Sequence, residues 1–228
     1  PEVVEAAWAN RGFLQRAVRR MAVEGGIRQF IDLGSGVPTQ RNTHEAVAEV
    51  RPDGRVLYVD VSPEVVAVAD ELLAGMPGVS AILVDIRDPD AVLGHPQTQR
   101  LIDFTEPVGL LMVAVTHFLP DSDDPWGLAA RYIDAVPSGS YFALSSVTAD
   151  HQEETWSAVL DPGRPKGYEG FPRSRAEVSR FFDGLEIVPP YQGAAGEVTF
   201  IGMWGAEDPG LADDDSSRLA YAAVARKP

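Results

Sequence analysis

The order of apolar and polar positions alternates between helical and strand patterns along most of the chain. Apolar side chains recur at helical spacing up to residue 21, and Gly25 and Gly26 end this first helix. Short apolar runs then predict strands at residues 30–33, 55–59, 79–84, 108–115 and 140–147. Strands that alternate with helices in this way are typical of a parallel sheet with right-handed crossovers.

Each later helix is predicted to begin at a polar capping residue. These residues are Asn42, Ser62, Asp124 and Ser174. Glu45 and Glu177 each follow a cap by three positions, which completes a capping box in both cases. The second box predicts a helix that runs to about residue 182.

Two more strands are predicted at residues 185–188 and 219–225. No helical pattern separates them, so we expect them to pair as antiparallel neighbours. The sequence therefore predicts one α/β domain over residues 1–228, a Rossmann-like, doubly wound sheet with helices on both faces. Residues 1–26 form the N-terminal helix of this domain and the turn that ends it.

The composition limits which catalytic groups, metal sites and partners the protein can have. The 228 residues include no cysteine, which excludes thiolate zinc sites and cysteine nucleophiles and fits a cytoplasmic protein. No signal-peptide pattern and no apolar run of the roughly 20 residues that span a bilayer appear, so we expect no membrane partner.

The net charge of −15 opposes a nucleic-acid substrate, because an acidic surface repels phosphates. Two groups of arginines could form a local basic patch, and we predict that both are solvated ends or faces of helices. They are Arg16, Arg19 and Arg20, and Arg173 with Arg175. A small-molecule or protein substrate is therefore favoured.

Glycines and acids follow the first three predicted strands. The first strand contains Asp32 and stops at Gly34-Ser35-Gly36, while Asp60 and Asp85 end the second and third strands. Ligands bind beyond the carboxyl ends of strands in an open parallel sheet. Glycines allow close backbone approach, and carboxylates at these places can accept ribose hydroxyls and an exocyclic amino group. The ordered set predicts an adenosine site.

The residues after the glycines argue against a dinucleotide. The dinucleotide fingerprint needs a third glycine where Thr39 stands, and Pro38 has no N–H to offer a phosphate. A carboxylate at Asp32 would repel a pyrophosphate, whereas it would favour an ammonium or sulfonium group. The pattern indicates an adenosyl ligand without a pyrophosphate.

Four stretches in this order carry a resemblance to a known enzyme family. They are DLGSG, VLYVDVSP, LVDIRDP and VGLLMVAVTHFLPD. Together they resemble class I S-adenosylmethionine-dependent methyltransferases. Further stretches such as GVPTQRNTHE and RLAYAAVARKP are similar to the bacterial family called S-adenosyl methyltransferase. The resemblance runs from about residue 8 to 188 and returns at the C-terminus.

The resemblance implies a seven-stranded sheet with an antiparallel last strand, and S-adenosyl-L-methionine as the cofactor. It implies contacts to the methionine part from Asp32, Gly34, Ser35 and Gly36. The ribose contact is Asp60, with Val61 also in the site, the adenine contacts are Asp85 and Ile86, and Ala114 and Val115 line the sulfonium. Members of the family usually begin with a further helical segment, which this sequence does not include, and Pro38 belongs to the G-x-P-T form of their motif.

The sequence gives fewer signals for the methyl-acceptor site than for the cofactor site, because a general base is needed only if the acceptor loses a proton. His117, just past the fourth strand, is the candidate base, and a structural imidazole is the alternative. Residues 150–180 are expected to cover the acceptor. Candidate acceptor contacts are His44, Trp156, Tyr168 and Phe171. Arg11 is a candidate for the cofactor carboxylate or an ordinary surface arginine.

We therefore expect a methyltransferase that moves a methyl group to O or N of a small molecule. No metal site is predicted, because His151, Glu153 and Glu154 do not converge on one helix. Two alternatives stay open, an NAD(P)-dependent oxidoreductase and a non-catalytic module that binds S-adenosylmethionine. The sequence leaves a homodimer open.

Overall fold

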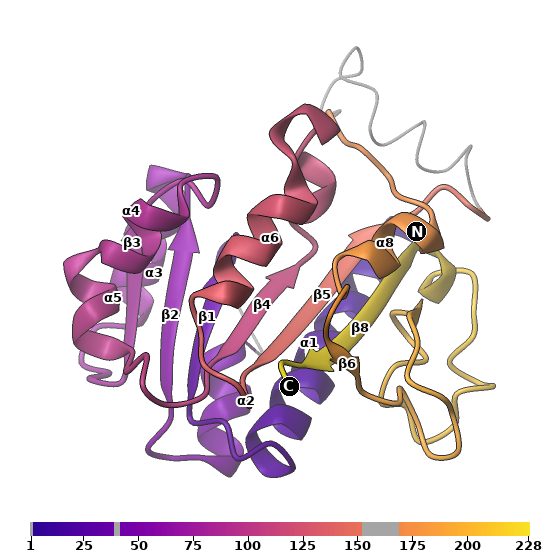
Figure 1. The fold of residues 1–228 in the computed structure, drawn as a ribbon, viewed down its shortest axis with the longest axis horizontal. Coiled ribbons are helices and arrows are strands. Elements are labelled where there is room, and N and C mark those ends of the chain that lie inside the picture. The colour runs from indigo at the N-terminus through magenta and orange to yellow at the C-terminus, as the bar shows by residue number, and fades with distance from the viewer. Residues whose placement is uncertain (1, 39–41, 152–168) are drawn as a thin grey trace.

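A computed structural model gives the fold of residues 2–38, 42–151 and 169–228 (Figure 1). The described part contains a mixed sheet in the order β3-β2-β1-β4-β5-β8-β6, with β7 also paired to β8. The strands are β1 (Gln29–Leu33), β2 (Arg55–Asp60), β3 (Val79–Leu83), β4 (Gly109–Val113), β5 (Tyr141–Val147), β6 (Glu186–Ile187), β7 (Thr199–Phe200) and β8 (Ala220–Arg226).

The direction of the strands confirms the predicted sheet. β1 to β5 are parallel, and β8 runs antiparallel to β5 over seven residue pairs. The expected antiparallel pair near the C-terminal end is β6 with β8. The two-residue strand β7 was not predicted; it shares the outer edge of β8 with β6, opposite Tyr221 and Ala222.

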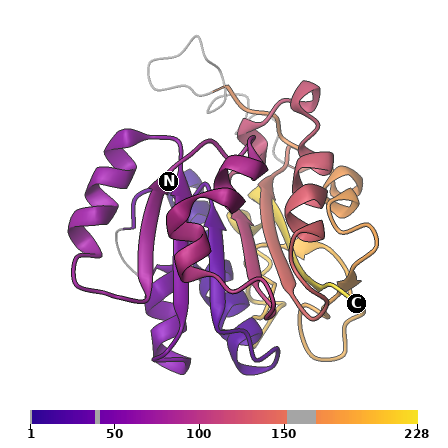
Figure 2. The ribbon, with the colours of Figure 1, turned by 60° about the vertical axis from the view of Figure 1, so that its left-hand side comes forward.

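Helices cover both faces of this sheet (Figures 1 and 2). The described α-helices are α1 (Glu2–Val23), α2 (Thr43–Val50), α3 (Pro63–Leu72), α4 (Pro89–Gly94), α5 (Pro96–Leu101), α6 (Pro125–Asp134) and α8 (Arg175–Arg180). Because side chains alternate along a strand, each face of the sheet has its own core. α1, α2 and α3 pack with Phe30 and Leu111 on one face, and α4, α5, α6 and α8 pack with Ile31 and Leu110 on the other.

Local capping interactions start these helices where the sequence predicts. The Ser62 hydroxyl accepts the N–H of Val65 at the start of α3. The carboxylate of Glu177 accepts the N–H of Ser174, so the second capping box is present. α8 ends at Arg180, two residues before the predicted end, and the short helices α4 and α5 were not predicted.

Among the described residues, no helix has both the length and the apolar character needed to cross a bilayer.

Candidate active site

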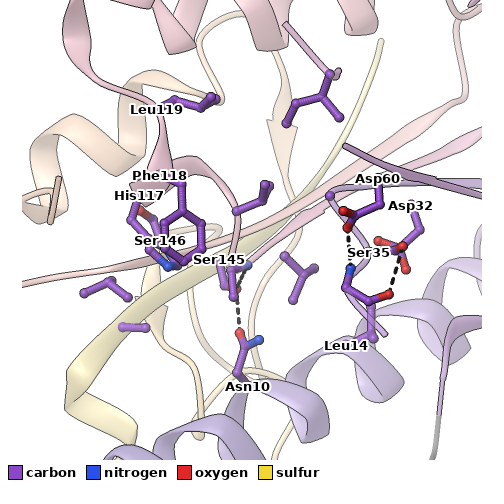
Figure 3. Close-up of a pocket in the computed structure, with 18 of the residues that line it drawn as sticks. Asn10, Leu14, Asp32, Ser35, Asp60, His117, Phe118, Leu119, Ser145 and Ser146 are labelled. Atoms are coloured by element: carbon purple, nitrogen blue, oxygen red, sulfur yellow. Dashed lines mark hydrogen bonds between the residues drawn. The ribbon is translucent and has the colours of Figure 1, made fainter. Parts of the chain in front are cut away.

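A pocket of about 730 Å³ opens beyond the carboxyl ends of β1, β2, β3 and β4. Figure 3 shows side chains from α1, from the strand ends and from the loop after β4 around it. The pocket is lined by all eleven residues predicted for the cofactor, and by His117. These eleven are Arg11, Asp32, Gly34, Ser35, Gly36, Asp60, Val61, Asp85, Ile86, Ala114 and Val115.

The turn after β1 brings the backbone to the pocket surface. Gly34 and Gly36 both have positive φ angles, of 74° and 63°, a conformation that favours glycine. A Cβ atom at Gly34 would overlap the side chain of Val115, whereas a Cβ at Gly36 would meet no other atom within 4 Å. Gly34 therefore lets the ends of β1 and β4 meet at the pocket.

Asp60 ties this turn to the end of β2. Its Oδ2 accepts the N–H of Gly36 at 2.9 Å, and its Oδ1 accepts the N–H of Ser62 at 2.9 Å. Each carboxylate oxygen has a second lone pair, so Asp60 can also accept hydroxyl groups from a ligand. Its carboxylate thus positions the glycine turn and lines the pocket at the same time.

Asp32 is buried beneath the same turn. Its Oδ2 accepts a hydrogen bond from the Thr43 hydroxyl of α2 at 2.6 Å. Burial raises the pKa of Asp32 to about 6, although the Thr43 hydrogen bond and the charge of Arg11 lower it. A positive ligand group next to Asp32 would favour the ionised carboxylate. Asp32 can therefore stabilise an ammonium or sulfonium charge.

Asp85 forms an ion pair at the rim of the pocket with Arg87, which sequence reasoning missed. Arg87 Nη2 donates to Asp85 Oδ2 at 2.6 Å, and its Nη1 reaches Asp123 Oδ2 at 3.3 Å. This arginine holds the pKa of Asp85 below its usual range. Arg87 stands two residues after Asp85 in LVDIRDP, and this spacing of opposite charges could have predicted the ion pair.

Ala114 adopts an uncommon backbone conformation where β4 ends, with a φ of 55°. Its N–H donates to the backbone oxygen of Ser145 at 3.1 Å and to Ser145 Oγ at 3.0 Å. The Ser145 hydroxyl in turn donates to Asn10 Oδ1 at 2.5 Å, as Figure 3 shows. Asn10 and Ser145 both line the pocket and were not predicted; Asn10 looks like any polar position of α1 in the sequence.

His117 lies in a 3-10 turn, Thr116–Phe118, and is 6% exposed. Burial, assisted by the charge of Arg173, lowers the pKa of His117 to about 3, so the imidazole is neutral near neutral pH. Its Nδ1 has no hydrogen-bond partner among the described residues. Its backbone oxygen accepts the N–H of Phe171 at 2.7 Å.

Of the other candidate acceptor contacts, the two that the structure describes do not line the pocket. His44 Nδ1 lies 2.7 Å from the hydroxyl of Tyr58 in β2, and neither His44 nor Phe171 lines the pocket. Trp156 and Tyr168 lie outside the described residues. Glu45 accepts the N–H of Asn42 at 2.7 Å and is a capping residue, as predicted.

The prediction that Arg173 is solvated was wrong. Arg173 is 2% exposed, and its guanidinium donates to the backbone oxygens of Thr116 and Leu119, both at 2.7 Å. It also pairs with Asp121 at 3.1 Å and lies 5.3 Å from the ring centre of Trp126. These acceptors come from the loop after β4, more than fifty residues earlier, so no local pattern could indicate them.

The prediction for Arg16 was wrong in the same way. Arg16 is half-buried, and its side chain donates to the backbone oxygens of Trp204 at 2.6 Å and Ile201 at 3.0 Å. Neither Arg16 nor Arg173 is therefore available for a basic surface patch.

The sequence profile of the S-adenosyl methyltransferase family matches residues 1–228. The chain belongs to this family. A candidate methyltransferase from Thermobifida fusca YX is 36% identical with a TM-score of 0.88, and the match covers 100% of this chain and 83% of the other. A DUF574 family protein from Streptomyces avermitilis MA-4680 is 38% identical with a TM-score of 0.86, over 96% of this chain and 83% of the other.

Membership in the S-adenosyl methyltransferase family confirms the resemblance that the motifs carry, and with it the S-adenosylmethionine-dependent activity. The N-methyltransferase NodS from Bradyrhizobium japonicum WM9, in complex with S-adenosyl-L-homocysteine, is 13% identical with a TM-score of 0.58. That match covers 94% of this chain and 85% of the other, and at such low identity it shows a shared fold. No protein with a curated description matches this sequence.

The pocket of this family member fits an adenosyl sulfonium. A Cβ atom at Gly34 would overlap Val115, so glycine is what allows the backbone to come to the pocket surface there. The buried Asp32 is a carboxylate that a positive ligand group would stabilise in its ionised form. Close backbone approach and a buried carboxylate are thus the two features by which the pocket suits a cationic cofactor.

Proposed function

We propose that the protein transfers the methyl group of S-adenosyl-L-methionine to O or N of a small-molecule acceptor inside this pocket. The observation that carries the proposal is that the predicted cofactor residues and His117 line one continuous cavity. The cysteine-free sequence supports a cytoplasmic location for this reaction.

The residue roles follow the order of the strands. The turn from Gly34 to Gly36 would hold the methionine part above Asp32, and Arg11 would reach its carboxylate. Asp60, with Val61 beside it, would accept the ribose hydroxyls. The adenine would lie against Ile86 with Asp85 as acceptor for its amino group. Ala114 and Val115 would line the sulfonium, because both directly follow β4 at the pocket.

When bound, the cofactor supplies an activated methyl group that moves to the acceptor by in-line displacement. The protein's part is to orient the acceptor atom and to exclude water. His117 is neutral near neutral pH, since burial and the charge of Arg173 lower its pKa to about 3. Its neutral imidazole can therefore accept a hydrogen bond from the acceptor. Because its pKa is low, the imidazole is a weak base and would not keep a proton taken from the acceptor.

Family membership removes the two alternatives that the sequence left open. An NAD(P)-dependent oxidoreductase would need a place for a pyrophosphate, and the turn after β1 presents a proline and a buried carboxylate there instead. The non-catalytic module, which the lack of a clear catalytic base kept open, is excluded because the family is one of methyltransferases.

Calorimetry with S-adenosylmethionine, S-adenosylhomocysteine and NADH tests the cofactor assignment. We expect both adenosyl ligands to bind and NADH not to bind, and NADH binding alone would overturn the proposal. Transfer of label from methyl-labelled cofactor into a metabolite extract then tests the small-molecule acceptor. Label recovered only in protein or nucleic acid would contradict that part.

A further inference from the structure

Asn10 of α1 lines the pocket and is held in one orientation by Ser145 of β5. The Ser145 hydroxyl donates to Asn10 Oδ1 at 2.5 Å, and Ser145 Oγ accepts the N–H of Ala114 at 3.0 Å. The first bond uses the single proton of the hydroxyl, which fixes the oxygen of the amide on the Ser145 side. Three pocket-lining residues, from α1, β5 and the turn after β4, thus form one hydrogen-bonded chain.

This orientation leaves the amide nitrogen of Asn10 with two N–H donors for a ligand. Figure 3 shows the nitrogen turned toward the side of the pocket on which Leu14 and Ser35 lie. Within the described part of the chain it makes no hydrogen bond, and Asn10 is only partly buried, so a ligand can reach it. Because the amide is already oriented, binding a ligand costs it little further side-chain entropy.

The charges around the pocket limit which ligand group these donors can take. The lining holds three carboxylates and two arginines, which are Asp32, Asp60, Asp85, Arg11 and Arg87. Carboxylates are in excess, so an anionic group needs donors that lie away from them. Asn10 is bonded to β5, which β4 separates from β1 and its Asp32 by two strand spacings, about 10 Å.

The methionine part of the cofactor carries both a positive and a negative group. Asp32 suits the positive part, whereas the carboxylate needs donors. α1 offers two donors in succession, because Asn10 and Arg11 both line the pocket. Arg11 Nη1 donates to Asn42 Oδ1 at 2.9 Å, which holds the guanidinium near the start of α2. Consecutive helical residues project about 100° apart, so the two side chains can approach one carboxylate from different directions.

We propose that Asn10, oriented by Ser145, binds the carboxylate of the methionine part of the cofactor together with Arg11. This inference rests on the proposed function and adds two residues to its site. Asn10 is the contact, and Ser145 is the positioning residue. Because Ser145 also binds the N–H of Ala114, one network holds the carboxylate end of the cofactor and the backbone beside the sulfonium.

The test is calorimetry with S-adenosylhomocysteine and with 5′-methylthioadenosine, which keeps the adenosine and the thioether but has no carboxylate. Asn10→Ala should weaken S-adenosylhomocysteine about tenfold, the effect of one hydrogen bond to a charged group. It should leave 5′-methylthioadenosine unchanged, which also shows that the variant folds. Asn10→Asp should weaken S-adenosylhomocysteine by more, since it replaces the donor with a like charge. Glu5→Ala, an exposed position of α1, is the matched control and should change neither ligand.

A double-mutant cycle tests the role of Ser145. Ser145→Ala should weaken S-adenosylhomocysteine in the unmodified protein and bring no comparable loss in the Asn10→Ala background. Equal losses in both backgrounds would show that Ser145 does not act through Asn10.

Two results with Asn10→Ala would overturn the carboxylate contact. One is an unchanged affinity for S-adenosylhomocysteine, and the other is an equal loss for both ligands. In either case the cofactor assignment stands, because the unmodified protein still binds S-adenosylhomocysteine. If the unmodified protein does not bind S-adenosylhomocysteine, the proposed function itself fails.

Discussion

Asp60 Oδ2 accepts the N–H of Gly36 at 2.9 Å, so the carboxylate that ends β2 holds the glycine turn that follows β1. One side chain thus holds the glycine turn and, in the proposed site, would also offer acceptors for the ribose. The two roles use different lone pairs of the same carboxylate. Substitutions at Asp60 that keep different numbers of acceptor oxygens can therefore distinguish its role in the turn from its role toward the ribose.

Asp60→Ala is expected to weaken S-adenosylhomocysteine binding by about 1–3 kcal/mol, because ribose hydroxyls and the Gly36 N–H lose their acceptor. Asp60→Asn keeps one acceptor oxygen and should lose less. Calorimetric titration measures both. Asp53→Ala is the control, since Asp53 is exposed and its ion-pair partner is Arg28, which precedes β1 and so lies at the opposite end of that strand from the glycine turn. Equal affinities of Asp60→Ala and the unmodified protein would show that the ribose lies elsewhere.

Gly34→Ala should destabilise the protein by about 3 kcal/mol, because it adds left-handed strain and an overlap with Val115. Gly36→Ala has the strain without the overlap and should cost about 1 kcal/mol. Urea unfolding measures the free energy of each variant. In a Val115→Ala background the added cost of Gly34→Ala should fall toward that of Gly36→Ala. An unchanged cost in that background would mean that Val115 is not the obstacle.

Asp32→Asn should flatten the dependence of stability on pH between about 4 and 6. Burial raises the pKa of Asp32 to about 6, above the ordinary value near 4, so the folded protein binds this proton more tightly than the unfolded chain. The contribution of Asp32 is therefore most favourable below about pH 4 and is lost as pH rises through about 6, a change of about 3 kcal/mol.

Urea unfolding of the unmodified protein and of Asp32→Asn at several pH values isolates this contribution, because the other carboxylates titrate in both proteins. Asp53→Asn serves as the control for an exposed acid and should follow the unmodified protein. Two curves that stay parallel from pH 4 to pH 7 would contradict the raised pKa of Asp32.

Arg173→Ala should lower the free energy of unfolding by about 3 kcal/mol, since two buried backbone oxygens lose their donors. Asp121→Asn, at the exposed end of the same ion pair, should cost less than about 1 kcal/mol. Urea unfolding of both variants makes the comparison. Similar losses for the two would show that the carbonyl hydrogen bonds of Arg173 contribute little.

Local and periodic signals made most of the fold predictable. Apolar runs located β1 to β5, and capping pairs such as Ser174 with Glu177 located helix starts, because both depend on residues close together in sequence. The glycine turn and the acids at the ends of β2 and β3 could be placed at one sheet edge, since parallel strands end on the same side. All of them line the pocket.

Features that depend on distant partners were not predictable. The burial of Arg173 depends on carbonyls in the loop after β4. Asn10 is held at the pocket by a hydrogen bond from Ser145, which lies 135 positions later in the sequence. α4 and α5, with six residues each, are too short to show a helical period. His44 sits against Tyr58 because of how α2 packs on β2, which no spacing in the sequence reveals.

β5 and β8 are neighbours over seven residue pairs, although residues 148–219 lie between them in the chain. The stretch between them, which includes β6 and β7 at the outer edge of β8, therefore begins and ends at adjacent strands, while every predicted cofactor residue precedes β5. The strands at the two ends of this stretch are hydrogen-bonded to each other. We expect changes in the length or sequence of this stretch to leave β1 to β4 and the turns that follow them in place.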